Sequence, residues 1–111
     1  MFGTLREKMS RKKALKIYKR GLDKAEMRDL DGAVSDYTLI LDMPEAPRDV
    51  KAMARLNRAL ANSSSRKYAL ADQDLREVLS APDAPEQVKE AARAKLTRLK
   101  RRIEEAGQPE E

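Results

Sequence analysis

The chain has 111 residues, a net charge of +5 and neither cysteine nor histidine, and these numbers exclude several classes of protein. Disulfides, thiolate nucleophiles and zinc-type clusters are excluded, and acid–base catalysis would fall to carboxylates, lysine or tyrosine. No apolar run approaches the ~20 residues that a membrane-spanning helix needs. No secretory leader pattern follows the start, so we expect a cytoplasmic protein. The abundance of Ala, Leu, Lys, Arg and Glu is typical of helical proteins.

Positive charge is concentrated near both ends of the chain. Residues 1–20 hold eight basic side chains and one acid, and residues 89–102 hold seven basic side chains and one acid. Residues 21–88 and the tail 103–111 each carry an excess of acids. Such asymmetry indicates either an anionic partner or, as the preferred interpretation, exposed helix faces solvated by lysine and arginine.

The first predicted helix pair occupies residues 13–50, after a basic N-terminal segment over residues 1–12. Apolar side chains spaced three to four residues apart predict both helices. The turn between them covers Asp29–Gly32, with Asp31 as the predicted N-cap. Pro44 and Pro47 end the second helix, because proline lacks the amide that a helix needs. The two apolar series are Leu15, Tyr18, Leu22 and Ala25, then Ala33, Tyr37, Ile40 and Leu41.

The second predicted pair occupies residues 51–88 and follows the same plan. Its turn is predicted at the polar cluster Asn62–Ser65, and Pro82 and Pro85 end its second helix. A single capping helix follows over residues 88–106, and the acidic tail 107–111 is expected to be disordered. The apolar side chains of the capping helix share one stripe: Val88, Ala92, Leu96, Leu99 and Ile103.

An internal repeat with a period of 38 residues relates the two pairs. Loop positions and helix positions match in one register: Pro44-Glu45-Ala46-Pro47 falls on Pro82-Asp83-Ala84-Pro85, and the helices align Arg20 with Arg58, Ala33 with Ala71, Asp36 with Asp74 and Leu41 with Leu79. One pair cannot bury its apolar face alone, but stacked neighbours can. The predicted fold is therefore all-α: a short helix–turn–helix solenoid of two helix pairs closed by a C-terminal capping helix.

Parts of both units resemble the tetratricopeptide repeat family. The first unit contributes Arg20-Gly21-Leu22, Asp29-Leu30-Asp31-Gly32-Ala33 and Asp36-Tyr37, and the second contributes Asn57-Arg58-Ala59-Leu60-Ala61 and Ala71-Asp72-Gln73-Asp74-Leu75. The resemblance implies that small residues let paired helices approach closely: Gly21, Ala59, Ala33 and Ala71. The period of 38 is longer than the 34 of the family, and Arg28 and Arg66 stand where the family usually has glycine.

The resemblance also implies a concave groove, lined by the first helix of each unit, that binds a peptide or an amphipathic helix. This groove would be apolar on the first two units and basic on the third. Carried over position by position, the predicted partner-binding residues are Leu15, Tyr18, Leu22, Met53, Leu56, Leu60, Arg98, Arg101 and Arg102. Family members that clamp the carboxylates of a chaperone tail need lysine and asparagine where this chain has Tyr18 and Leu22. Asn57 and, roughly, Lys95 match two other clamp positions. Because half of the clamp is missing, we do not expect chaperone-tail binding.

The predicted function is a non-catalytic adaptor or scaffold for a protein or peptide partner, with no cofactor and no metal. Other occupants of the groove stay open, namely the chain's own Phe2, Leu5 and Met9, or a second copy in a homodimer. Asp36 and Asp74 recur by repeat symmetry, which favours structural bonds to Arg20 and Arg58 over catalysis. No phosphate-binding loop or nucleophile motif is present.

The alternative function is electrostatic binding of an anionic partner by the basic terminal helices. That partner would be nucleic acid, an acidic peptide or an anionic membrane. No aromatic platform for stacking bases accompanies the arginines, and the basic N-terminal segment is short for a membrane-surface helix. We therefore expect neither nucleic acid nor membrane contact from the sequence.

Overall fold

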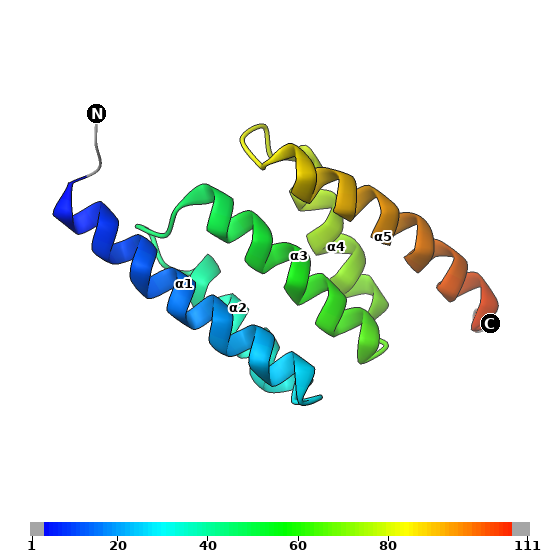
Figure 1. Ribbon diagram of the computed structural model, residues 1–111. Coiled ribbons are helices and arrows are strands. Elements are labelled where there is room, and N and C mark those ends of the chain that lie inside the picture. The colour runs from blue at the N-terminus through cyan, green and yellow to red at the C-terminus, as the bar shows by residue number, and fades with distance from the viewer. Residues whose placement is uncertain (1–3, 108–111) are drawn as a thin grey trace.

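The computed structural model describes residues 4–107, which form five consecutive α-helices (Figure 1). Each helix packs against the next, and α1 also contacts α3 while α3 also contacts α5. Among the described residues α2 and α4 do not touch, so α1, α3 and α5 form one row and α2 and α4 lie behind it. The body measures 53 × 29 × 18 Å. The helices are α1 (Leu5–Glu26), α2 (Leu30–Leu41), α3 (Arg48–Ser64), α4 (Tyr68–Ser80) and α5 (Glu86–Glu105).

The start of α1 lies well inside the basic N-terminal segment. A capping box fixes it, in which the Thr4 side chain accepts from the Glu7 amide at 3.1 Å and the Glu7 carboxylate accepts from the Thr4 amide at 2.9 Å. Residues 5–12 are therefore the first turns of the same helix that carries Leu15 and Tyr18.

Two predicted turn details are wrong, each for a local reason. The N-cap of α2 is Asp29 and not Asp31, because Asp29 is the last residue before the helix and its carboxylate accepts from the Gly32 amide at 3.0 Å. The polar cluster Asn62–Ser65 does not form the second turn. The helix continues through Ser64, since Asn62 is buried against neighbouring helices.

Both hairpin turns contain an arginine with a left-handed backbone. Arg28 has φ 67° and Arg66 has φ 64°. At each turn the next amide reaches back to a carbonyl five residues earlier, from Asp29 to Lys24 and from Lys67 to Asn62, both at 2.8 Å. This is the C-terminal cap in which glycine is the usual residue, because a Cβ is unfavourable there.

The apolar core consists of two clusters rich in alanine. One lies between α1, α2 and α3 and contains Ala14, Ala33, Tyr37, Ile40, Ala46, Val50 and Ala54. The other lies between α3, α4 and α5 and contains Ala52, Ala59, Ala71, Leu75, Val78, Ala84, Val88, Ala92, Leu96 and Leu99. Small residues set the helix spacing, as expected. A Cβ on Gly21 would lie only 2.6 Å from the ring of Tyr37.

Candidate binding surface

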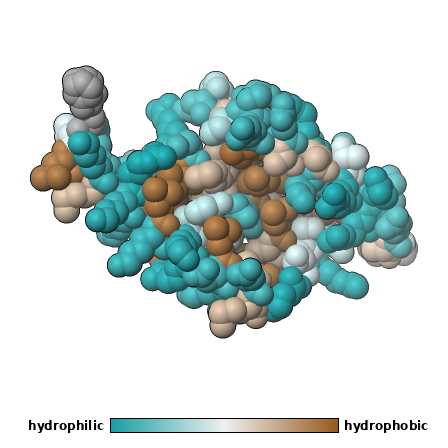
Figure 2. Space-filling model, viewed as in Figure 1, coloured by the Kyte–Doolittle hydropathy of each residue, from teal (hydrophilic) through white to brown (hydrophobic). Residues whose placement is uncertain are grey.

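The predicted partner-binding residues all lie on the row of α1, α3 and α5. The first helices of the predicted units thus share one face of the molecule (Figure 1). Figure 2 shows this face, with hydrophobic side chains gathered in its middle and a hydrophilic surround. The arrangement brings an apolar part on α1 and α3 next to a basic part on α5.

The side chains of the apolar part on α1 and α3 differ in exposure: some are exposed and others are half-buried. Leu15 and Leu22 on α1 expose 37% and 38% of their surface. Tyr18, Met53 and Leu56 are half-buried and pack against the core clusters, so they serve both the core and the surface. A charge introduced at Leu56 would therefore destabilise the fold, whereas Leu22 can be changed with less disturbance.

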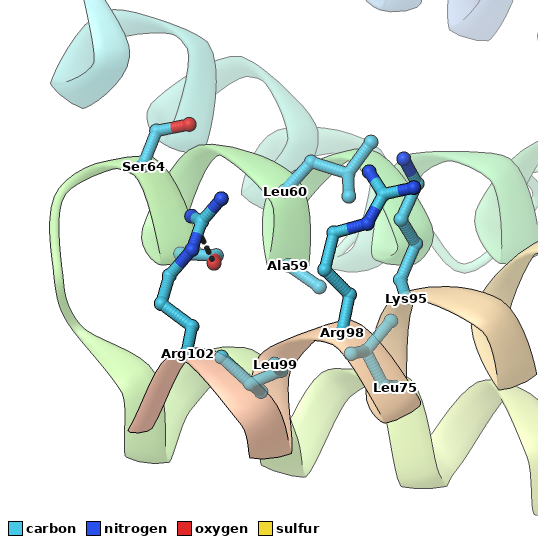
Figure 3. Close-up of a pocket in the computed structure, with 9 residues that line it drawn as sticks. Ala59, Leu60, Ser64, Leu75, Lys95, Arg98, Leu99 and Arg102 are labelled. Carbon is cyan, nitrogen blue, oxygen red and sulfur yellow. Dashed lines mark hydrogen bonds between the residues drawn. The ribbon is translucent and has the colours of Figure 1, made fainter. Parts of the chain in front are cut away.

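An open pocket of about 240 Å³ lies between α3 and α5. Its floor is apolar, because Ala59, Leu75 and Leu99 are each at least nine-tenths buried. Leu60 forms part of its wall. Figure 3 shows Lys95 and Arg98 projecting side by side from α5, with Arg102 one turn further along. The Arg102 guanidinium donates to the Ser63 hydroxyl at 3.4 Å, and Ser64 completes the rim.

The rim of this pocket carries an uncompensated positive charge. The one ion pair of α5 within residues 4–107 joins Arg93 to Glu86, on another side of the helix. Lys95, Arg98 and Arg102 therefore share the rim without an acidic partner among the described residues, and no acid lines the pocket. A carboxylate placed there would relieve the repulsion between the three cations and accept charge-assisted hydrogen bonds.

The structure separates the predicted arginines. Arg98 and Arg102 line the pocket, but Arg101 is exposed and does not. Lys95 does line it, and the sequence already contains the signal, because residues 95, 98 and 102 follow helical spacing on one face. Ser63 was missed as a lining residue because the polar cluster was interpreted as a turn.

Asn57 acts as a bridge between two helices of the row. Its amide nitrogen, 2.9 Å from both acceptors, donates to the Tyr18 hydroxyl on α1 and to the Met53 carbonyl of its own helix. Burial raises the pKa of Tyr18, against a smaller lowering effect of the hydrogen bond from Asn57. The Asn57 side chain therefore already has partners for its amide protons.

The two repeated acids bond the arginines that the sequence indicated. Arg20 holds Asp36 with two hydrogen bonds of 2.7 and 3.0 Å, and Arg58 holds Asp74 with two of 2.8 Å. Hydrogen bonding from Arg20 is the largest cause that lowers the pKa of Asp36, and Lys24 contributes at 3.1 Å. Each pair joins the two helices of its own hairpin, which confirms the predicted bonds of these acids to Arg20 and Arg58.

Leu5 and Met9 do not fill the groove. Leu5 and Met9 expose 74% and 61% of their surface at the far end of α1, and Phe2 lies outside the described residues. Within residues 4–107, no cluster of three or more acids could hold a metal ion, and no helix is long and apolar enough to cross a membrane.

No protein-family model, curated protein or solved structure shows a significant match to this chain.

Proposed function

We propose that the chain is a non-catalytic interaction module whose α1–α3–α5 face binds a peptide with apolar side chains and an acidic group. The observation that carries this proposal is the pocket between α3 and α5, where an apolar floor meets a rim of three cations without acidic partners. The same row of helices also carries the exposed leucines of α1, Leu15 and Leu22. Apolar side chains would supply burial, and the carboxylate would fix the register of the peptide.

We also propose that the domain is built from tetratricopeptide-like repeats with a period of 38 residues. Three pairs of features at this separation support the proposal. They are the ion pairs of Asp36 and Asp74, the left-handed turns at Arg28 and Arg66, and the buried small residues Gly21 and Ala59. In such a stack the first helices form the inner row, which is the row that carries the pocket.

The experiment is a selection of displayed random peptides against the full chain, followed by affinity measurement with labelled synthetic peptides. We expect the selected peptides to share apolar residues and at least one acid. Arg98→Ala with Arg102→Ala should weaken binding by about 100-fold or more, because each charge-assisted hydrogen bond contributes about 1.5–3 kcal/mol and the variant removes at least two of them. Lys100→Ala with Arg101→Ala is the matched control, since it removes the same charge from α5 outside the pocket.

The apolar part has its own matched pair of variants. Leu22→Glu on α1 should weaken binding strongly, whereas Leu39→Glu on α2 should not, although Leu39 is exposed to a similar extent at 47%. Circular dichroism checks that both variants fold. Equal effects of the two substitutions, or equal effects of the two arginine variants, would contradict the proposed site.

A second copy of the chain is the competing occupant of this face. Light scattering over a dilution series, at low and high salt, distinguishes the two cases. A monomer leaves the face free for a peptide. A dimer that survives high salt and is broken by Leu22→Glu would show that the apolar part serves self-association instead.

A further inference from the structure

The first turns of α1 carry a second surface that the proposed peptide site does not use. Every residue from 4 to 13 is at the surface, with Ser10 alone half-buried, and the first buried residue of the helix is Ala14. Figure 1 shows this end of α1 projecting beyond the other helices. Leu5 and Met9 are the two most exposed apolar side chains of this segment.

Cations without acidic partners surround these two apolar side chains. The ion pairs that α1 makes among the described residues use Arg11, Lys19, Arg20 and Lys24. That leaves five cations over the first turns, namely Arg6, Lys8, Lys12, Lys13 and Lys16. Three acids lie nearby. Asp49 pairs with Arg11, Glu7 is engaged in the capping box, and Glu45 borders the hollow next to Leu5 and Met9.

This distribution of charge works against the stability of the helix. The N-terminal end of a helix carries partial positive charge and favours acids, but this end is crowded with cations. Its first turns also gain nothing from the core, and short unsupported helices are marginal in water. The Thr4–Glu7 capping box and the bidentate Arg11–Asp49 pair, at 3.0 and 3.1 Å, hold the segment in place. The unpaired cations at this end of α1 do not stabilise the fold, and an external anionic surface would give them a partner.

We propose that this face of α1 docks on an anionic lipid bilayer. Leu5, Met9, Lys12, Lys13 and Lys16 follow each other at intervals of one to four residues that place them on one side of the helix, and all five are exposed. The two apolar side chains enter the boundary between headgroups and acyl chains, while the lysines contact lipid phosphates and carboxylates. The side of α1 that carries Leu22 stays available, so both surfaces can act together.

The apolar pair favours a bilayer over nucleic acid as the anionic partner. A phosphate backbone offers no apolar layer to receive Leu5 and Met9, and residues 4–16 contain no aromatic ring on which bases could stack. The structure adds what the sequence lacked, because the basic segment is a helical continuation of α1 rather than a short separate element.

The test is co-sedimentation of the full chain with vesicles of phosphatidylcholine, with and without phosphatidylserine. We expect binding only to the vesicles that contain phosphatidylserine. The variant Lys12→Gln, Lys13→Gln, Lys16→Gln should lower partitioning on the order of 100-fold, from the contribution of each lysine near an anionic surface. The matched control is Lys89→Gln, Lys100→Gln, Arg101→Gln, which removes the same charge from α5 outside the peptide pocket and should keep most of the partitioning.

The variant Leu5→Ser, Met9→Ser tests insertion separately from charge. Both side chains are exposed, so the unfolding temperature should not change, but partitioning should fall about tenfold or more as apolar burial is lost. Three results would each overturn the proposal: equal loss in the α5 control, unchanged partitioning of the serine variant, or tighter binding to a single-stranded oligonucleotide than to the anionic vesicles.

Discussion

Replacing Gly21 by alanine places a methyl group against the ring of Tyr37, where the new Cβ would lie 2.6 Å from Cε1 and 3.0 Å from Cδ1. Tyr37 is 1% exposed and also contacts the ring of Tyr18, with the ring centroids 6.1 Å apart, so it has little room to move. Alanine stabilises a helix interior by about 1 kcal/mol over glycine. Overpacking a core costs about 1–3 kcal/mol. The balance predicts a net destabilisation of about 1 kcal/mol.

The effect of Gly21→Ala on stability should change sign when Tyr37→Leu removes the ring. Residues 59 and 75 stand 38 positions after 21 and 37, and there the chain has Ala59 and Leu75, both buried in the second core cluster. Tyr37→Leu alone should cost about 1–3 kcal/mol because it leaves unfilled space. In that background Gly21→Ala meets no ring and keeps its helix gain, so it should stabilise by about 1 kcal/mol, a coupling of about 2 kcal/mol.

Urea unfolding followed by circular dichroism measures all four proteins of this double-mutant cycle. A shift of the midpoint at constant slope reports stability without a change in the unfolded state. If the effects of the two substitutions simply add, Gly21 does not make the contact described here. The correspondence between the Gly21–Tyr37 and Ala59–Leu75 pairs would then lose its main physical support.

Three further predictions concern the turns and the titratable groups. Arg28→Gly and Arg66→Gly should each raise the free energy of unfolding by about 0.5–1 kcal/mol, because glycine adopts the left-handed backbone without strain. Alanine at either position keeps the strain, so urea unfolding of the alanine variants should show no such gain. Burial raises the pKa of Tyr37 from 10.0 to about 12. Between these two pH values the folded protein keeps a proton that the unfolded chain releases, so thermal scans should show stability falling as pH rises; a flat profile, or an identical one for Tyr37→Phe, would refute this. The lowered pKa of Asp36 works in the opposite direction: its contribution is present above the ordinary pKa of the carboxyl and is lost as the pH falls through the folded pKa, so Asp36→Asn should flatten the acid limb of the stability profile.

Periodicity predicted the helices because apolar side chains recur at helical spacing, but it did not give the buried face of α1, where Ala14 and Gly21 are buried while Leu15 and Leu22 are exposed. The prolines at 44, 47, 82 and 85 fixed the ends of the hairpins, since α3 begins directly after Pro47 and α5 directly after Pro85. The exact caps were harder to predict. Asp29 and Asp31 are both good caps in isolation, and only the three-dimensional start of α2 decides between them. The serine run was misleading because burial of Asn62 overrode the local turn preference.

The candidate site was predictable in outline and not in detail. Helical spacing could place Arg98 and Arg102 on one face, but the pocket depends on how α3 and α5 pack around Ala59 and Leu99. Sequence pattern cannot report how far two packed helices separate. The extension of α1 back to Leu5 was missed, although Thr4 and Glu7 have the spacing of a capping box in the sequence.

Nuclear magnetic resonance can show whether the row of α1, α3 and α5 receives a partner. A selected peptide is titrated into the isotope-labelled full chain, and the backbone amide shifts are followed. We expect the largest changes around Leu22, Leu60, Arg98 and Arg102. Changes concentrated instead around Leu39 and Leu70, the exposed leucines of α2 and α4, would contradict it.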